Sequence, residues 1–232
     1  MPQYGLGRHP HPDTPRAAQL YPVTAHPKYA IATNSWAYWW EGGAWLDQGQ
    51  TGTCVFNAAN HRFADAPVPQ TGITEAIAQH DYVAATGDTS MEQGTSGLVM
   101  CRYYASKGKI SAYHWVTTPD ELRNAVLTIG SVCVGVNWYN SMFNPKVAYG
   151  TGRAYMNVDR SSGLAGGHEF VINGIVMKPT AGPPFYRMKN SWGKSWPGSP
   201  YGAGTARFAL TDLEELIFGE NGDAVVITET TA

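Results

Sequence analysis

The sequence has little of several features on which whole classes of protein depend, beginning with cysteine. Its 232 residues include three cysteines, Cys54, Cys101 and Cys133. Three cysteines this far apart do not suit a disulfide framework or a zinc site, and an odd number leaves at least one thiol unpaired. His9 and His11 lie close together but have no third ligand nearby. We therefore expect a reducing compartment, no metal and no cofactor.

Charge and long apolar runs are also scarce. Charged residues make up 15% of the chain, the net charge is −2, and lysine and arginine do not cluster, so we expect no nucleic-acid partner. No apolar run approaches the roughly 18 residues of a membrane span. The first ten residues lack the apolar core of a signal peptide. These absences predict a cytoplasmic protein without membrane contact, and they predict nothing about its oligomeric state.

Glycine, proline and aromatic residues are plentiful instead. The 26 glycines, 15 prolines and 12% aromatic residues are typical of a compact, loop-rich globule with a mixed sheet. Periodicity and capping patterns predict helices at 53–61, 74–84, 98–107 and 119–127, and a helical turn at 211–217. Apolar runs and paired glycines predict strands at 131–138, 166–174, 185–189, 206–210 and 224–227.

The order of these elements predicts the domain organisation. Residues 1–34 are rich in proline, histidine and tyrosine without periodicity, so we expect an extended arm lying on the body. Residues 35–232 then form a single domain. Because its first half is helix-rich and its second half strand-rich, we expect two lobes, roughly 35–115 and 116–232, with a seam between them.

An aromatic cluster precedes the first long predicted helix. It consists of Trp36, Tyr38, Trp39, Trp40 and Trp45. We expect these rings to pack in the core and to anchor the loop that follows. If they were exposed, a sugar-stacking platform would be the alternative.

The loop at 46–53 leads into Cys54, where the predicted helix begins behind Thr53 as its N-cap. The N–H groups and positive dipole end of a helix stabilise a thiolate, the nucleophilic form of cysteine. Gln48 lies six positions upstream, and its carboxamide can donate to an oxyanion beside the Cys54 N–H. This pattern indicates a candidate nucleophile with its oxyanion donors.

A nucleophilic cysteine needs a base and a group that orients the base. Of seven histidines, His168 stands at a strand start behind two glycines, and Asn190 ends the next strand. If these strands pair, the Asn190 side chain can accept a hydrogen bond from the imidazole, with Trp192 and Trp196 covering that bond. His61 lies two helical turns from Cys54 and is too distant to be its base.

Three segments in this order resemble the papain (C1) family of cysteine peptidases: Gln48-Gly49-x-x-Gly52-x-Cys54, the glycine-led His168, and Asn190-Ser191-Trp192-Gly193-x-x-Trp196. The resemblance covers roughly residues 35–228. It implies an α+β papain-like fold with a helical N-terminal lobe, an antiparallel sheet or barrel as the C-terminal lobe, and the active site in the cleft between them.

The resemblance also implies roles for individual residues. Cys54 corresponds to the nucleophile, His168 to the general acid/base, Asn190 to the residue that orients the imidazole, and Gln48 to the oxyanion donor. The implied reaction is endopeptidase cleavage of a peptide or protein substrate through a thioester acyl-enzyme. The implied substrate-binding residues are Gly52, Gly94, Thr95, Gly135, Gly167, Trp192 and Trp196. Among these, Gly94 and Thr95 face the substrate backbone, while Gly167 and Gly135 line the pocket for the residue preceding the cleavage-site residue.

The chain departs from the family pattern at several positions. Val55 stands where an aromatic residue is usual, and Thr51 replaces a disulfide cysteine. The absence of that bridge, together with the absence of a secretion signal, suggests an intracellular bacterial or viral branch. Glu169 follows His168, and if buried beside the imidazole it would raise the pKa of His168. Only about 45 residues precede the motif, so either regulation lies elsewhere or the arm takes the part of the family's inhibitory pro-segment.

Two alternatives to an endopeptidase stay open. One is a binding protein on a retired peptidase fold, because fold alone does not determine function. The other is an amidase or acyl-transfer enzyme that acts on cell-wall crosslinks, which an exposed aromatic cluster at 36–45 would favour.

Overall fold

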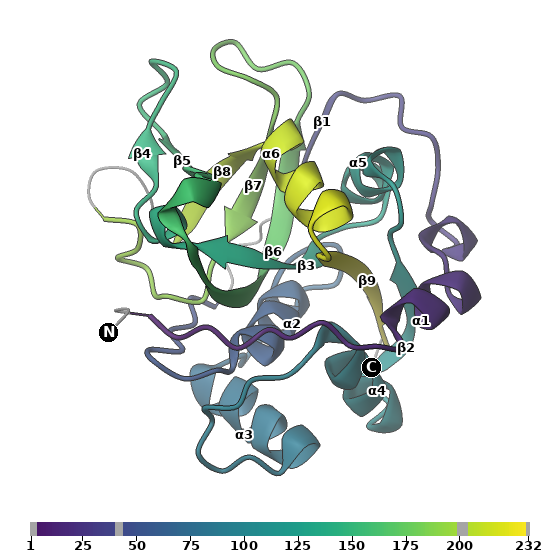
Figure 1. The fold of residues 1–232 in the computed structure, drawn as a ribbon. Coiled ribbons are helices and arrows are strands. Elements are labelled where there is room, and N and C mark those ends of the chain that lie inside the picture. Colours follow the sequence, from purple (N-terminus) through teal and green to yellow (C-terminus); the bar gives the residue numbers. More distant parts are fainter. Residues whose placement is uncertain (1–3, 40–43, 199–203, 231–232) are drawn as a thin grey trace.

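The computed structural model describes residues 4–39, 44–198 and 204–230 (Figure 1). Helices pack against both faces of a large curved sheet, and the N-terminal segment crosses the molecule toward a short helix at its edge. The expected strands are all present, with small differences at their ends. The α+β class predicted from the sequence is therefore confirmed.

Within the described ranges, nine strands form one sheet with the order β2-β9-β3-β6-β7-β8-β5-β4, and β1 pairs with β6. The strands are β1 Trp36–Tyr38, β2 Ile110–Trp115, β3 Val132–Tyr139, β4 Lys146–Val147, β5 Ala154–Tyr155, β6 Leu164–Val176, β7 Phe185–Lys189, β8 Thr205–Ala209 and β9 Asp223–Glu229. The pairs are antiparallel except that β5 runs parallel to β8. The expected wholly antiparallel sheet is thus wrong at this edge, where short strands form from the irregular segment after β3.

The helices lie close to their expected positions. They are α1 Thr14–Leu20, α2 Cys54–Ala64, α3 Glu75–Thr86, α4 Gly97–Ser106, α5 Pro119–Thr128 and α6 Leu210–Glu214, which continues into the π-helical turn η4 Glu215–Gly219. Side-chain oxygens of Thr74, Ser96 and Thr118 accept from backbone N–H groups and cap α3, α4 and α5. Helix α1 is a correction, because residues 1–34 contain a helix where only extended chain was expected.

Buried apolar side chains gather in two clusters. One surrounds α2 and α4 and includes Phe56, Phe63 and Tyr104. The other lies around α5, α6 and the faces of β3, β6 and β7, with Trp138 and Phe170 among its members. Helix α2 is buried along its whole length because it packs on β6 and lies against α3 and α4. This burial fixes the position of its first residue, Cys54.

The aromatic segment before α2 does not pack as expected. Trp36 is 63% exposed and Tyr38 is 52% exposed, because they alternate with buried Ala37 on the edge-paired strand β1. Trp39 is partly buried and donates from Nε1 to the Val126 carbonyl at 2.5 Å. Trp40 lies outside the described residues. The prediction of core packing is therefore wrong for Trp36 and Tyr38.

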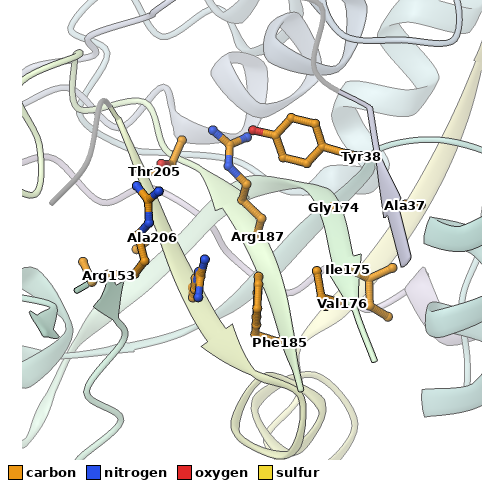
Figure 2. A pocket seen from close by; sticks show the side chains of 12 residues that line it. Ala37, Tyr38, Arg153, Gly174, Ile175, Val176, Phe185, Arg187, Thr205 and Ala206 are labelled. Carbon is orange, nitrogen blue, oxygen red and sulfur yellow. The ribbon is translucent and has the colours of Figure 1, made fainter. Parts of the chain in front are cut away.

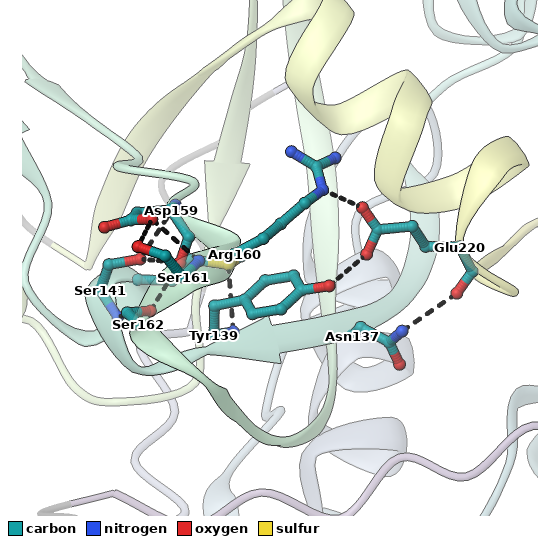
Figure 3. Close-up of polar contacts among 9 residues, drawn as sticks. Asn137, Tyr139, Ser141, Asp159, Arg160, Ser161, Ser162 and Glu220 are labelled. Atoms are coloured by element: carbon teal, nitrogen blue, oxygen red, sulfur yellow. Dashed lines mark hydrogen bonds and ion pairs between the residues drawn. The ribbon is translucent and has the colours of Figure 1, made fainter.

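Glu220, which follows η4, makes hydrogen bonds to the end of β3 and to the segment after it. The Glu220 carboxylate accepts from Tyr139 Oη at 2.6 Å and from Arg160 Nε at 2.5 Å. Its backbone carbonyl accepts from Asn137 at 3.1 Å. Figure 3 shows Tyr139 and Arg160 converging on this one side chain. Beside it, Ser141 Oγ donates to the Asn157 carbonyl. This bond holds together two parts of the segment between β3 and β6, which contains no long strand.

No helix in the described part of the chain is long and apolar enough to cross a bilayer.

A buried ion pair ties α2 to β9 and allows a test of the packing. Arg62 contacts Glu229, and both side chains are almost fully buried. We expect Glu229→Gln to lower the free energy of unfolding by about 3–5 kcal/mol, because the guanidinium loses its buried counter-charge. Urea denaturation measures this change. The matched control is Asp13→Asn, which breaks the exposed Asp13–Arg102 pair and should cost less than about 1 kcal/mol. Equal effects of the two substitutions would contradict the prediction.

Candidate active site

Cys54 is the first residue of α2, as the sequence predicts. The loop before it is held to the segment after β7, because Gln48 N donates to the Ser191 carbonyl at 2.9 Å and Gly193 N donates to the Leu46 carbonyl at 3.0 Å. Thr53 stands at the N-cap position but does not cap with its side chain. Its hydroxyl instead contacts Thr51 Oγ1 at 2.8 Å and accepts from Asn57 Nδ2 at 2.9 Å.

His168 and Asn190 are brought together by the pairing of β6 with β7. The two strands are antiparallel, and Asn190 directly follows β7. His168 Nε2 lies 2.7 Å from Asn190 Oδ1, and both residues are fully buried. Asn190 Oδ1 also accepts from the Ser191 N–H at 2.9 Å, which fixes the carboxamide. The imidazole is therefore held in one orientation.

Aromatic rings enclose the imidazole. Trp192 stacks on His168 with ring centroids 4.7 Å apart, and Trp138 meets it edge-on at 4.8 Å. Trp196 packs edge-on against Trp192 at 5.3 Å. Trp138 was not predicted for the site, because its place depends on the register that sets β3 beside β6. The His168–Asn190 bond thus lies in an apolar, water-excluding surrounding.

Gln48 is buried and its carboxamide is fully engaged. Its Oε1 accepts from Ser191 Oγ at 2.5 Å, so the Nε2 group faces the opposite way. Nε2 donates to the Thr51 carbonyl at 2.7 Å and reaches the Gly5 carbonyl of the N-terminal arm at 3.3 Å. The Gly5 carbonyl oxygen therefore accepts from the same Gln48 amide group that the sequence predicts as a donor to an oxyanion.

The Cys54 thiol and the His168 imidazole are both neutral in this arrangement. Burial, reinforced by the charge of Glu169, raises the pKa of Cys54 to about 12, although backbone hydrogen bonds from Glu169, Gly7 and Val55 act to lower it. Burial lowers the pKa of His168 to about 4 against the opposite effect of Asn190. The expected thiolate is thus absent here, because burial outweighs the helix N-terminus. Within the described residues, His168 Nδ1 has no hydrogen-bond partner.

Glu169 does not act on its neighbour in sequence. Successive side chains of a strand point to opposite faces, so His168 faces Trp138 and Trp192 whereas Glu169 faces the other side of β6. There its carboxylate lies near Gly97, Arg8 and Asp223. The expectation that Glu169 raises the pKa of His168 is therefore wrong, and the charge of Glu169 bears on Cys54 instead.

The N-terminal arm lies across the site as an extended peptide, seen as the purple segment in Figure 1. Gly7 N and Arg8 N donate to the Gly167 carbonyl at 3.1 and 2.9 Å. Thr95 N donates to the Gly7 carbonyl at 2.7 Å, and His9 N donates to the Thr95 carbonyl at 2.7 Å. The residues that the sequence assigns to backbone binding of a substrate thus hold the chain's own arm.

Missing side chains allow this close approach. A Cβ on Gly7 would come 2.1 Å from the Gly52 carbonyl oxygen, and one on Gly94 would come 2.1 Å from the Gly7 carbonyl oxygen. A Cβ on Gly167 would come equally near the Arg8 carbonyl oxygen. Tyr4 extends the contact by stacking on Trp192 at 4.6 Å. Gly52, Gly94 and Gly167 therefore line a narrow channel, in which the backbone of the arm approaches so closely that added Cβ atoms would collide with it.

Comparison with known proteins finds likeness in structure and none in sequence. No family model and no curated protein matches this sequence. Xylellain, a cysteine protease from Xylella fastidiosa, is 16% identical with a TM-score of 0.66, and the match covers 99% of this chain and 97% of xylellain. The procathepsin B S9 of Trypanosoma congolense is 13% identical with a TM-score of 0.66, covering 98% and 87%.

A third similar structure is the proform of the cysteine protease Amb a 11, a ragweed pollen allergen. It is 18% identical with a TM-score of 0.64, and the match covers 98% of this chain and 75% of that one. The chain has a papain-like fold. Because all three matches span at least 98% of the chain, the papain-like likeness takes in part of the N-terminal arm as well as the body. The bacterial or viral branch stays a prediction.

Three charged residues, Arg8, Glu169 and Asp223, lie near one another in this papain-like fold. The sequence did not predict that they form one group. Arg8 and Asp223 form a buried ion pair although 215 positions separate them. No local pattern signals such a pair, because it depends on the arm crossing the sheet. Elsewhere in the described ranges, no group of three or more His, Cys, Asp or Glu side chains is arranged to hold a metal ion.

A cavity of about 420 Å³ lies away from Cys54, between β1 and the strands β7 and β8 (Figure 2). Its lining includes arginine side chains stacked on aromatic rings: Arg187 lies 4.8 Å from the Tyr38 ring and Arg207 lies 4.0 Å from the Phe185 ring. None of the predicted site residues lines it. The arm lies on Thr95 and Gly167 through backbone hydrogen bonds, so the candidate site residues are separate from this cavity.

The burial of His168 predicts that its imidazole titrates at a lower pH than an exposed histidine. In the intact chain, we expect the imidazole to stay neutral down to about pH 4, because burial disfavours the imidazolium. Since this pKa lies below that of an unfolded histidine, His168 stabilises the fold above about pH 6.5, and that stability is lost as pH falls toward 4. Ring-carbon chemical shifts of labelled histidine measure the pKa, with His168→Gln to assign the signal. A midpoint near or above pH 6.5 would contradict the prediction.

Proposed function

We propose that this chain is a cysteine peptidase with a Cys54-His168-Asn190 site, and that its own N-terminal arm holds the site closed. The observation that carries the proposal is the His168–Asn190 hydrogen bond of 2.7 Å beneath Trp192, on the strand β6 against which α2, with Cys54 as its first residue, packs in a papain-like fold. The positions of the arm on Gln48, Thr95 and Gly167 support the second part.

The proposed reaction begins when the arm leaves and a substrate takes its place. Cys54 Sγ transfers its proton to His168 Nδ1 and attacks the peptide carbonyl carbon. Gln48 Nε2, released from the Gly5 carbonyl, and the Cys54 N–H stabilise the oxyanion. The C–N bond breaks as His168 returns the proton to the leaving amine, which leaves a thioester on Cys54.

Water completes the proposed cycle. His168 takes a proton from the water, whose oxygen attacks the thioester carbonyl, and the carboxylic product leaves as Cys54 regains its proton. By accepting from Nε2–H, Asn190 leaves Nδ1 as the nitrogen that takes and returns the proton in the proposed cycle. His168 Nδ1 has no hydrogen-bond partner among the described residues, which is consistent with its use as the proton acceptor.

Closure by the arm is tested by making it too large for its channel. We expect Gly7→Ala to speed labelling of Cys54 by a papain-family epoxide about tenfold or more, because the added Cβ would meet the Gly52 carbonyl oxygen at 2.1 Å. Intact-protein mass spectrometry measures the rate. The control is Pro10→Ala on the exposed part of the arm, which should leave the rate unchanged. Equal labelling of Gly7→Ala and the unaltered chain would refute closure.

The catalytic assignment is tested in the opened Gly7→Ala background. Cys54→Ala should abolish labelling, and His168→Ala should slow it by about 10²-fold or more, because the thiol loses its base. Peptide cleavage should fall in parallel. Labelling that is slow in all forms, or spread over Cys101 and Cys133, would favour a retired peptidase that acts by binding.

Exposure of Trp36 and Tyr38 favours a second candidate, an amidase or acyl-transfer enzyme on cell-wall crosslinks that uses the same site. Exposed aromatic rings suit stacking on sugar rings. Cleavage of muropeptides in preference to plain peptides, lost in Trp36→Ala, would support this candidate over the endopeptidase.

A further inference from the structure

Arg8 places its side chain in a pocket beside Cys54. The side chain is 1% exposed, and its Nη2 lies 2.7 Å from Asp223 Oδ2 and 3.0 Å from the Asn221 carbonyl oxygen. A Cβ on Gly135 would come 2.7 Å from Arg8 Nε and 2.8 Å from Asp223 Oδ1. The absence of a side chain at Gly135 therefore makes the room that the guanidinium fills.

The sheet register builds the pocket with two carboxyl groups. Gly135 on β3 lies opposite Glu169 on β6 and opposite Asp223 on β9, so the three residues form one row on one face of the sheet. Glu169 and Asp223 are both buried, and burial raises the pKa of each while Arg8 lowers it. Neither carboxylate oxygen of Glu169 has a hydrogen-bond partner within the described chain, whereas Asp223 Oδ2 lies 2.7 Å from Arg8 Nη2. Asp223 is therefore the carboxyl group that pairs directly with the guanidinium.

The backbone around Arg8 is bound as any extended peptide can be bound. Arg8 N donates to the Gly167 carbonyl at 2.9 Å, and the flanking residues exchange hydrogen bonds with Thr95. These contacts use main-chain groups, which every sequence supplies, so they contribute affinity without selecting a side chain. Selection depends on the pocket.

We propose that the pocket of Gly135, Gly167, Glu169 and Asp223 selects substrates that carry arginine at the position Arg8 takes in the arm, with Asp223 as the specificity-determining residue. This proposal rests on the proposed peptidase function. A buried carboxylate without a counter-charge is costly, so a neutral side chain leaves Asp223 uncompensated whereas a guanidinium pairs with it. Both polar contacts of the guanidinium, with Asp223 and with the Asn221 carbonyl, come from Nη2, so they select a cation, and the comparison with lysine below tests the preference for arginine.

Cleavage of matched peptides tests the selection. The Gly7→Ala chain is given short acetylated peptides that differ only at the position corresponding to Arg8. This position carries arginine, its neutral isostere citrulline, lysine or leucine. We expect kcat/KM for arginine to exceed that for citrulline about 30-fold or more, because a charge-assisted bond to a buried carboxylate is lost. Asp223→Asn should reduce this ratio to about threefold or less.

A control variant separates the pocket from the general loss of an ion pair. Glu214→Gln removes a buried carboxylate that pairs with Arg123 at 2.6 Å on α5, away from the cleft, and should keep the preference for arginine. Cleavage of all four peptides at similar rates, with Cys54 still labelled by the epoxide, would overturn the specificity and leave the peptidase function intact.

Binding gives a readout that does not need activity. A synthetic peptide of residues 4–10 is titrated by calorimetry into the Gly7→Ala, Cys54→Ala chain, carrying either arginine or citrulline at position 8. We expect about 30-fold weaker binding of the citrulline peptide, and a difference of about threefold or less when Asp223→Asn is added. Equal affinities in the chain with Asp223 would overturn the proposal even if no substrate is cleaved. Loss of both labelling and cleavage, with the affinity difference preserved, would instead refute the peptidase function.

Discussion

The alternation of side chains along β6 separates the surroundings of His168 from those of Glu169. One face of this strand carries His168, which lies among Trp138 and Trp192 and bonds to Asn190 from the neighbouring strand. The other face carries Glu169, which belongs to the acidic pocket around Arg8. Because strand geometry directs the side chains of adjacent residues to opposite faces, an imidazole enclosed by aromatic rings and a carboxyl group near a cation occupy consecutive positions without contact between them.

Backbone approach is the second constraint, and glycine makes it possible. The arm lies so near the channel of Gly52, Gly94 and Gly167 that added Cβ atoms on Gly7, Gly94 or Gly167 would collide with carbonyl oxygens. Contacts of this kind bind an extended peptide without regard to its sequence. The arm combines such backbone contacts with one buried side chain, Arg8, which pairs with Asp223.

Burial also sets the electrostatic state of the site. Because both side chains are fully buried, the charged forms of Cys54 and His168 lose solvation, and their pKa values move apart in the directions that keep both neutral. The helix N-terminus at Cys54 favours a thiolate, but it acts against a larger desolvation effect. The backbone N–H of Gly7 in the arm also lowers the pKa of Cys54, so this contact of the arm opposes the effect of burial.

Local patterns in the sequence were enough for the elements and for the positions of the candidate site residues. Helix α2 with Cys54 at its start, the strands β3, β6 and β7, and the capped helix α5 all follow from periodicity, glycine placement and capping residues, which act over a few positions. The pairing of β6 with β7 then brings His168 to Asn190, as their positions at strand ends suggest. Motif order pointed to the papain-like fold, which the structural matches confirm.

Tertiary structure alone decided what surrounds those residues. The row of Glu169, Gly135 and Asp223 depends on the registers of three strands, and the pairing of Arg8 with Asp223 joins residues 215 positions apart. The exposure of Trp36 and Tyr38 depends on which face of β1 is covered, and the neutrality of Cys54 depends on its complete burial. Burial and charge are set by everything that packs around a group, so they cannot be derived from the few residues beside it in sequence.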